Sequence, residues 1–254
     1  MEKLRRQLIM LAREYNLVSV KGGTEVEAMT FPEIRLMRRL SAGLMPMTVK
    51  IGGPEARNDI RFMLDIGIDT ILAPMVESAY SLRNFVRTME ECDPAGKASL
   101  AVNIETITAF YNLNSITAAP EFGKVSHVTV GRSDLSGSMN KGVEDPEVTR
   151  ITREIIEITA ELGCSTSVGG QVCTETARNV QEHIPADTIN TRHMTVSLAS
   201  PHITADIEAV LGWEKAFYQL VMAQYPERRS FCLGRIRSIE SRTAGPALIK
   251  TAVS

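Results

Sequence analysis

The sequence has no long apolar run and no excess of charge of either sign. Its first fifteen residues, MEKLRRQLIMLAREY, carry charged side chains throughout, unlike a signal peptide. No segment approaches the ~18 consecutive apolar residues that a membrane-spanning helix needs. The 28 basic and 30 acidic residues give a net charge of -2, whereas surfaces for nucleic acid or anionic lipid are strongly basic. We therefore predict a cytoplasmic protein that binds neither nucleic acid nor membrane.

Motifs for the common cofactors are also missing. The four cysteines (Cys92, Cys164, Cys173 and Cys232) form no CxxC pair and no zinc-like spacing, so we expect reduced, packed thiols. No Gly-x-Gly-x-x-Gly follows the first predicted strand, and no Walker A motif is present. These absences argue against a dinucleotide-binding sheet and against a P-loop enzyme.

Short β-rich runs alternate with longer amphipathic stretches along the 254 residues. Several of the runs are apolar on both faces and rich in Val, Ile and Thr, which is typical of buried parallel strands. Helices are expected between them, for example from Pro32 to Gly43 and from Pro54 to Gly67. The predicted strands are 17–22, 47–53, 70–78, 99–105, 127–136, 164–170 and 188–196.

This alternation predicts an α/β fold, a TIM-type (β/α)8 barrel formed by residues 1–228. Seven strands are visible where eight are needed. Three explanations stay open: a missed first strand near Leu8–Ala12, an incomplete barrel, or closure by a segment from elsewhere. The poorly patterned tail, 229–254, is expected to act as a C-terminal helical arm that packs on a neighbouring subunit, or to be partly mobile.

Polar residues end several of the predicted strands, where the active sites of barrels lie. Glu105 and Asp134 lie at the C-terminal ends of neighbouring predicted strands, and Lys21, Lys50 and Arg192 lie near the ends of others. The two carboxylates would either join a network of salt bridges with these cations or bind a hard cation such as Mg²⁺ or Mn²⁺. Among the four histidines, only His193 ends a predicted strand and is expected to face the mouth.

Three stretches resemble the HpcH/HpaI aldolase and citrate lyase β-subunit family, which belongs to the pyruvate/phosphoenolpyruvate barrel superfamily. They are LAPMVESAYSLRNFV (72–86), VNIETITAFYNLNSI (102–116) and VGRSDLSGSMNKG (130–142). The resemblance runs from about Val20 to about Leu198. It implies a barrel, a bound Mg²⁺ or Mn²⁺, a 2-oxo acid substrate, and a homo-oligomer built from dimers, often a hexamer.

The resemblance also implies roles for individual residues. Glu105 and Asp134 would be the metal ligands. Asn103 would lie near the substrate, and backbone amides around Ser133 and Asp134 would receive the pyruvate carboxylate. Lys50 stands where the family's aldolases have an Arg, and Lys is not equivalent to Arg.

The stretch VKGGTEVEAM (20–29) lacks the catalytic His of the family's aldolases. One of Lys21, Glu25 and Glu27 must replace that histidine, or the usual proton transfer is absent. Glu25 is the candidate acid/base group, and Lys21 is expected near the substrate. Arg132 and Arg192 would bind a distal carboxylate or phosphate of the substrate, or pair with nearby acids.

The leading hypothesis is a metal-dependent carbon–carbon lyase. It would act on a 4-hydroxy-2-oxo acid or a citrate-like substrate through a metal-stabilised pyruvate enolate, with Lys50 adding positive charge. One alternative is a Schiff-base aldolase with Lys50 or Lys21 as nucleophile. Others are a phosphoenolpyruvate-using enzyme of the same superfamily and a non-catalytic sensor of 2-oxo acids.

Overall fold

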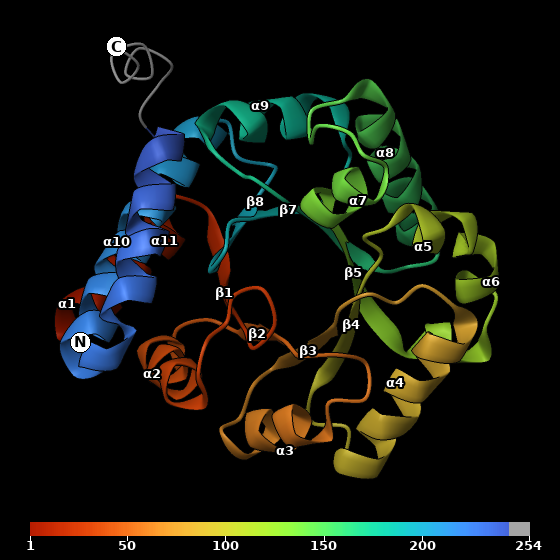
Figure 1. Cartoon of the computed structure of the whole chain (residues 1–254), viewed down its shortest axis with the longest axis horizontal. Helices are drawn as coiled ribbons and strands as arrows, with labels where there is room; N and C mark the ends of the chain where they lie inside the picture. Colours follow the sequence, from red (N-terminus) through yellow and green to blue (C-terminus); the bar gives the residue numbers. More distant parts are fainter. Residues whose placement is uncertain (244–254) are drawn as a thin grey trace.

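A closed barrel of eight strands forms the centre of the computed structural model, which describes residues 1–243 (Figure 1). Each strand pairs with its neighbours in chain order, which confirms the predicted TIM-type barrel. The strands are β1 Leu17–Gly23, β2 Met47–Lys50, β3 Thr70–Ala73, β4 Ser99–Asn103, β5 Val125–Gly131, β6 Ser165–Gly169, β7 Thr188–Asn190 and β8 Met194–Ser197.

The eighth strand comes from the last predicted run, 188–196. This run is a hairpin: β7 and β8 are antiparallel and joined by residues 191–193. β8 is also antiparallel to β1, with Val20 opposite Met194, whereas β1 to β7 are parallel. Two of the open explanations, a missed first strand near Leu8–Ala12 and an incomplete barrel, are therefore wrong. Leu8–Ala12 lies in a helix, β1 is present, and the atypical strand is the last one.

Helices surround the barrel, and local sequence fixes where several of them start. Thr30 begins α2 with a capping box to Glu33, while Ser78 and Asp145 cap α4 and α8. No helix within residues 1–243 is long and apolar enough to cross a membrane. The α-helices are α1 Glu2–Glu14, α2 Phe31–Ser41, α3 Arg57–Asp65, α4 Ala79–Cys92, α5 Ile107–Tyr111, α6 Leu113–Thr117, α7 Arg132–Ser138, α8 Pro146–Glu161, α9 Thr174–His183, α10 Ile203–Gln224 and α11 Arg229–Thr243, with short 3-10 helices at Pro120–Lys124 and Pro226–Arg228.

The last two helices bring the chain back to the mouth of the barrel, the end at which the parallel strands finish. Near its start, α10 contacts the residue before β1 through a hydrogen bond from Asn16 to Asp206 (2.9 Å). Further along, Glu214 accepts from Thr191 in the β7–β8 turn (2.6 Å). After α10, Arg228 donates to Ala28 O in the loop after β1 (2.7 Å). α10 therefore runs from the opposite end of the barrel toward the mouth, where α11 begins.

α11 packs on its own chain through the buried Cys232 and Ile239. Contact between segment 229–254 and a neighbouring subunit stays a prediction, and residues 244–254 of that segment lie outside the described part. All four cysteines are free thiols.

The interior of the barrel is polar, whereas its apolar core lies between strands and helices. Ser167 binds both Thr129 (2.7 Å) and Asn190 (2.9 Å), and Asn190 accepts from Thr195 (2.8 Å). Barrels of this type usually fill their interior with Val, Ile and Leu. The hydrogen-bonded network fixes the side chains that form the floor of the site described next.

Candidate functional site

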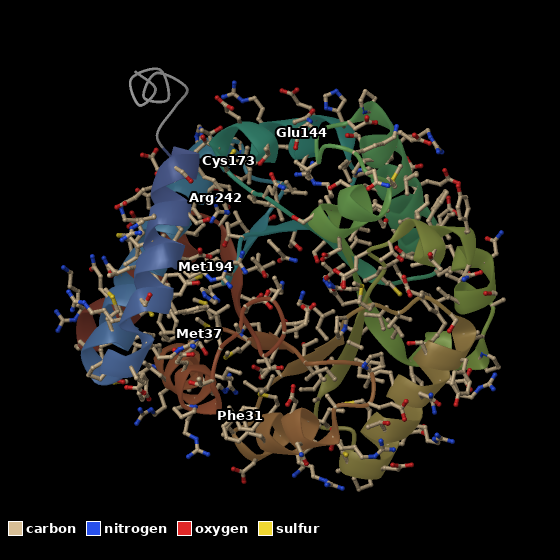
Figure 2. All side chains as sticks on the ribbon, in the orientation of Figure 1. Phe31, Met37, Glu144, Cys173, Met194 and Arg242 are labelled. Carbon is tan, nitrogen blue, oxygen red and sulfur yellow. The ribbon has the colours of Figure 1, made fainter. Side chains whose placement is uncertain are left out.

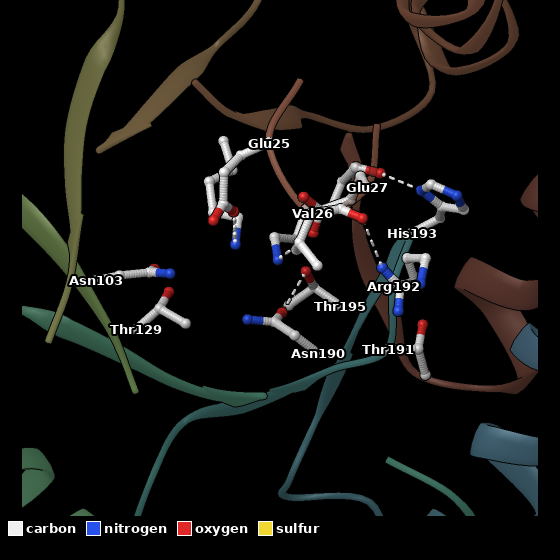
Figure 3. Close-up of polar contacts among 12 residues, drawn as sticks. Glu25, Val26, Glu27, Asn103, Thr129, Asn190, Thr191, Arg192, His193 and Thr195 are labelled. Carbon is white, nitrogen blue, oxygen red and sulfur yellow. Dashed lines mark hydrogen bonds and ion pairs between the residues drawn. The ribbon is translucent and has the colours of Figure 1, made fainter. Parts of the chain in front are cut away.

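A cavity opens at the mouth of the barrel, where the parallel strands end. It has a volume of about 150 Å³ and is open to solvent. Side chains from both halves of the barrel face into it (Figure 3). Its charged and polar lining residues include Lys21, Glu27, Lys50, Asn103, Glu105, Thr129, Ser133, Asp134, Asn190, Arg192 and Arg242.

Glu105 is buried in the wall formed by β4 and β5 and is only 1% exposed. Its carboxylate accepts hydrogen bonds from Met75 N (3.1 Å) and from Asn103 Nδ2 (2.7 Å). Met75 has a φ of 53°, an unusual conformation in which its N–H reaches Glu105. Gly131 leaves room for the side chain, because a Cβ at position 131 would collide with Glu105 Oε2.

Asp134 lies in the first turn of α7, directly after β5, and its side chain is exposed at the cavity. Burial raises the pKa of Glu105; Lys50 opposes this shift and the negative charge of Asp134 adds to it. The two carboxylates therefore repel each other across one cavity, and a cation between them would relieve that repulsion.

This pair of carboxylates suits a hard cation. Mg²⁺ commonly uses one or two protein carboxylates and completes its shell with water and substrate oxygens. Within residues 1–243 no group of three His, Cys, Asp or Glu side chains could hold a metal. Glu105 and Asp134 both line the cavity, and their role as metal ligands stays a prediction.

Lys50 forms the opposite wall and is 3% exposed. It makes an ion pair with Glu25. Burial alone would lower the pKa of Lys50, but the charges of Glu27, Glu105 and Glu25 outweigh burial and raise it. Lys50 therefore stays charged near neutral pH, which suits electrostatic stabilisation better than nucleophilic attack.

Glu25 and Glu27 lie two residues apart but occupy different environments. Glu25 is held by Lys50 and is not among the residues lining the cavity. Glu27 lines it, is 3% exposed, and pairs with Lys21 (3.4 Å). Its Oε2 atom is buried without a hydrogen-bond partner within residues 1–243. Burial would raise the pKa of Glu27, but Lys21 and Lys50 outweigh burial and lower it.

Other predicted substrate-binding residues fall at the cavity. Lys21 and Ser133 line it, and so does Asn103, whose Oδ1 is buried without a partner in the described chain. Gly170, with a φ of 103°, lies so close to Ser133 N that a Cβ there would approach it to 2.6 Å. The loop that follows β6 is therefore packed tightly against the start of α7.

The structure separates Arg132 from Arg192. Arg132 is fully buried, donates to Glu144 (3.0 Å) and Gly170 O (3.3 Å), and is not among the cavity-lining residues. This geometry favours ion pairing over substrate binding. Arg192 lines the cavity and donates to Val26 O (3.3 Å).

His193 does not face the mouth, contrary to the sequence-based expectation. It is fully buried, its Nε2 contacts Tyr218 Oη (2.7 Å) and its Nδ1 contacts Lys21 O (3.1 Å). Burial lowers the pKa of His193. The residue lies in the β7–β8 turn, so it packs against α10 instead of ending a parallel strand.

Sequence analysis missed several lining residues. Thr129 and Asn190 come from within strands, and their neighbours gave no sign that the barrel interior is polar. Arg242 comes from the end of α11, in a tail without a clear pattern (Figure 2). A local sequence pattern cannot show which end of the barrel that tail covers.

The sequence model of HpcH/HpaI aldolase/citrate lyase matches residues 49–181, just over half of the chain. The chain belongs to this family. HpcH/HpaI membership points to a carbon–carbon lyase of the aldolase or citrate lyase type. No curated protein sequence matches the chain.

Solved structures share the barrel of this HpcH/HpaI chain. A family protein from Burkholderia cenocepacia J2315 has 16% identity and a TM-score of 0.57, over 73% of this chain and 82% of that one. A family aldolase from Desulfitobacterium hafniense DCB-2 has 18% identity and a TM-score of 0.57, over 73% and 81%. The citrate synthase SbnG has 16% identity and a TM-score of 0.56, over 74% and 81%. At these identities the likeness establishes the fold.

Proposed function

We propose that the chain is a metal-dependent carbon–carbon lyase that forms or cleaves a 4-hydroxy-2-oxo acid or a citrate-like substrate. The observation that carries the proposal is the convergence of Glu105 and Asp134 on one cavity, opposite the charged Lys50. Glu105 and Asp134 would hold Mg²⁺ or Mn²⁺. The bound ion would supply Lewis-acid stabilisation of negative charge on the oxygens of a 2-oxo acid.

The substrate half of the proposal rests on the residues around this pair. Asn103 lines the cavity and donates to Glu105, and its buried Oδ1 has no partner among residues 1–243, so we expect Asn103 to orient the carboxylate and to offer an acceptor to the substrate. Backbone amides of Ser133 and Asp134 receive the carboxylate of the 2-oxo acid. Lys50 stabilises the negative charge of the enolate that forms when the carbon–carbon bond breaks.

Glu27 replaces Glu25 as our proposed acid/base group. A general base must reach the proton that it takes and must be ionised at the working pH. Glu27 lines the cavity, its buried Oε2 has no hydrogen-bond partner within residues 1–243, and its lowered pKa keeps it ionised. Glu25 is engaged by Lys50, so it orients that lysine. A Schiff-base mechanism is disfavoured because Lys50 is ion-paired with a raised pKa.

Binding of Mn²⁺ tests the proposal directly. We expect Mn²⁺ to bind in the presence of oxalate, which resembles the enolate of pyruvate, as measured by calorimetry. Glu105→Gln and Asp134→Asn should each weaken this binding strongly, while Glu175→Gln, at an exposed carboxylate in the first turn of α9, should leave it unchanged. Equal Mn²⁺ affinity in the wild type and both site variants would contradict the proposal.

Assembly and ligand remain part of the proposal. We propose that the chain forms a homo-oligomer built from dimers, such as a hexamer. We also propose that it binds a small 2-oxo acid. Light scattering coupled to size-exclusion chromatography would measure the mass of the particle, and a monomer would contradict the proposed homo-oligomer.

A further inference from the structure

Three arginines gather on one side of the mouth, and two of them come from the last helix. Arg192 Nη1 (3.3 Å) and Arg235 Nη2 (2.7 Å) donate to the same atom, the carbonyl oxygen of Val26. Arg242 Nη1 donates to Val172 O (3.3 Å), beside the start of α9 (Figure 2). Val26 and Val172 both line the cavity, as do Arg192 and Arg242.

No carboxylate partners these arginines within the described residues. Their hydrogen bonds there all go to backbone carbonyls, those of Val26, Val172 and Ser238. The Nε atom of Arg235 is buried without a partner in the same part of the chain. Burial lowers the pKa of Arg235, and the charges of Arg192 and Arg242 lower it further.

The charges around the cavity do not balance. Five cationic side chains lie at or beside it, those of Lys21, Lys50, Arg192, Arg235 and Arg242, against four carboxylates, those of Glu25, Glu27, Glu105 and Asp134. Glu27 is already paired with Lys21. A divalent metal at Glu105 and Asp134 would increase the positive excess by two, and the single carboxylate of pyruvate would remove only one charge. Clustered like charges near a cavity are costly without a counter-charge.

We propose that Arg192 and Arg242 form an anion subsite for a second, terminal oxyanion of the substrate, a carboxylate or a phosphate, and that Arg235, which lies behind them, adds positive charge and holds Val26 O beside Arg192. Planar guanidinium groups bind such oxyanions with two parallel hydrogen bonds. The substrate of this enzyme is therefore a 2-oxo acid, or its aldol adduct, with an anionic group at the far end. This inference rests on the proposed function for the 2-oxo end only.

Matched ligands test the subsite. In the presence of Mn²⁺, calorimetry would compare 2-oxoglutarate with 2-oxovalerate, which has the same chain length but no terminal carboxylate. We expect 2-oxoglutarate to bind about 10-fold to about 100-fold more tightly, since hydrogen bonds to charged groups have this magnitude. The same comparison with 2-oxo-4-phosphonobutyrate shows whether phosphate-like or carboxylate groups are preferred.

Variants assign the preference to the arginines. Arg242→Gln and Arg192→Gln should each reduce the preference for 2-oxoglutarate over 2-oxovalerate to less than about 3-fold, without weakening the binding of 2-oxovalerate. Arg242→Lys should retain part of the preference. Arg237→Gln, at an exposed position of α11, is the matched control and should keep it all. Circular dichroism and thermal unfolding confirm that each variant is folded. Equal binding of the two ligands by the wild type, or a preference that survives both Gln variants, overturns the subsite.

A metal-free measurement separates this inference from the proposed function. Propane-1,2,3-tricarboxylate carries no 2-oxo group, and we expect it to bind the metal-free wild type more tightly than Arg242→Gln. If no 2-oxo acid binds with Mn²⁺ but this Arg242-dependent binding persists, the proposed function fails and the subsite stands. If the tricarboxylate and the 2-oxo diacids both fail to bind the wild type, the subsite is overturned.

Discussion

Glu105 and Asp134 stand at or directly after the ends of β4 and β5, whereas Arg192 and Arg242 stand on a hairpin turn and on the last helix. The two walls also differ in their relation to the family. The matched stretch, 49–181, contains the carboxylate wall and ends before the arginine wall. The family match therefore covers the two carboxylates that we propose for the metal and does not cover the arginines that we propose for the far end of the substrate.

The order of the chain supports this division. Lys50 and Asn103 also fall within the matched stretch, while Lys21 and Glu27 precede it. The acid/base group and the anion subsite that we propose are thus both outside it. We therefore expect variants of Glu105 and Asp134 to lose metal binding and catalysis, and variants of Arg192 and Arg242 to lose the preference for a second anionic group.

The largest effect is expected on the carboxylate wall. Glu105→Gln should lower kcat for aldol cleavage by about 1,000-fold, because it removes a charged ligand of the group that stabilises the transition state. Steady-state kinetics with saturating Mn²⁺ measures the loss. Recovery of full activity at high Mn²⁺ would show that Glu105 only strengthens metal binding.

Glu27→Gln should lower kcat by about 100-fold, the ordinary contribution of a general base, and leave the affinity for Mn²⁺ unchanged. Kinetics and calorimetry on the same preparation separate the two quantities. Glu25→Gln is the matched control, with a smaller loss expected through the orientation of Lys50. A larger loss in Glu25→Gln than in Glu27→Gln would return the role to Glu25.

Gly131→Ala should weaken Mn²⁺ binding by about 10-fold, because the added Cβ displaces Glu105 without removing its charge. Calorimetry measures the affinity, and Gly123→Ala, where a Cβ meets no atom within 4 Å, is the control. Unchanged affinity in Gly131→Ala would mean that the position of Glu105 is not critical for the metal.

The smallest effect concerns pH. Because the pKa of Glu105 is raised by burial, the folded chain binds this proton more tightly than the unfolded chain does. In the metal-free protein, protonation of Glu105 therefore stabilises the fold as the pH falls through that pKa. Mn²⁺ binds the ionised form, so the rise in Tm caused by Mn²⁺ should shrink from about pH 8 to about pH 5, just above the ordinary Glu pKa of about 4.3. Differential scanning fluorimetry measures it, and a constant rise would argue against Glu105 as a ligand.

Sequence could predict the carboxylate wall because two general rules apply to it. Apolar runs mark parallel strands, and polar groups at their C-terminal ends meet at one mouth, which places Lys50, Glu105 and Asp134. The same rules failed for the run 188–196, because hydrophobic pattern reports burial but not a reversal of direction. That reversal turned His193 toward α10 and hid β8.

The other misses have related causes. In the sequence, Glu25 and Glu27 are both carboxylates of one loop. Only side-chain packing shows that Glu25 pairs with Lys50 and that Glu27 lines the cavity. Arg242 reaches the mouth through contacts far apart in the chain, such as its hydrogen bond to Val172. No local pattern contains that information.

The reversed direction of β8 has a consequence for protein engineering. Because β8 runs against its neighbours, the chain leaves the barrel at the end away from the mouth, and α10 then carries it back to the mouth. The segment after β8 can therefore be exchanged with that of a relative without cutting a strand of the barrel, as long as the buried face of α10 is kept. Chimeras joined at residues 198–202 offer a way to recombine substrate preference with a constant catalytic barrel.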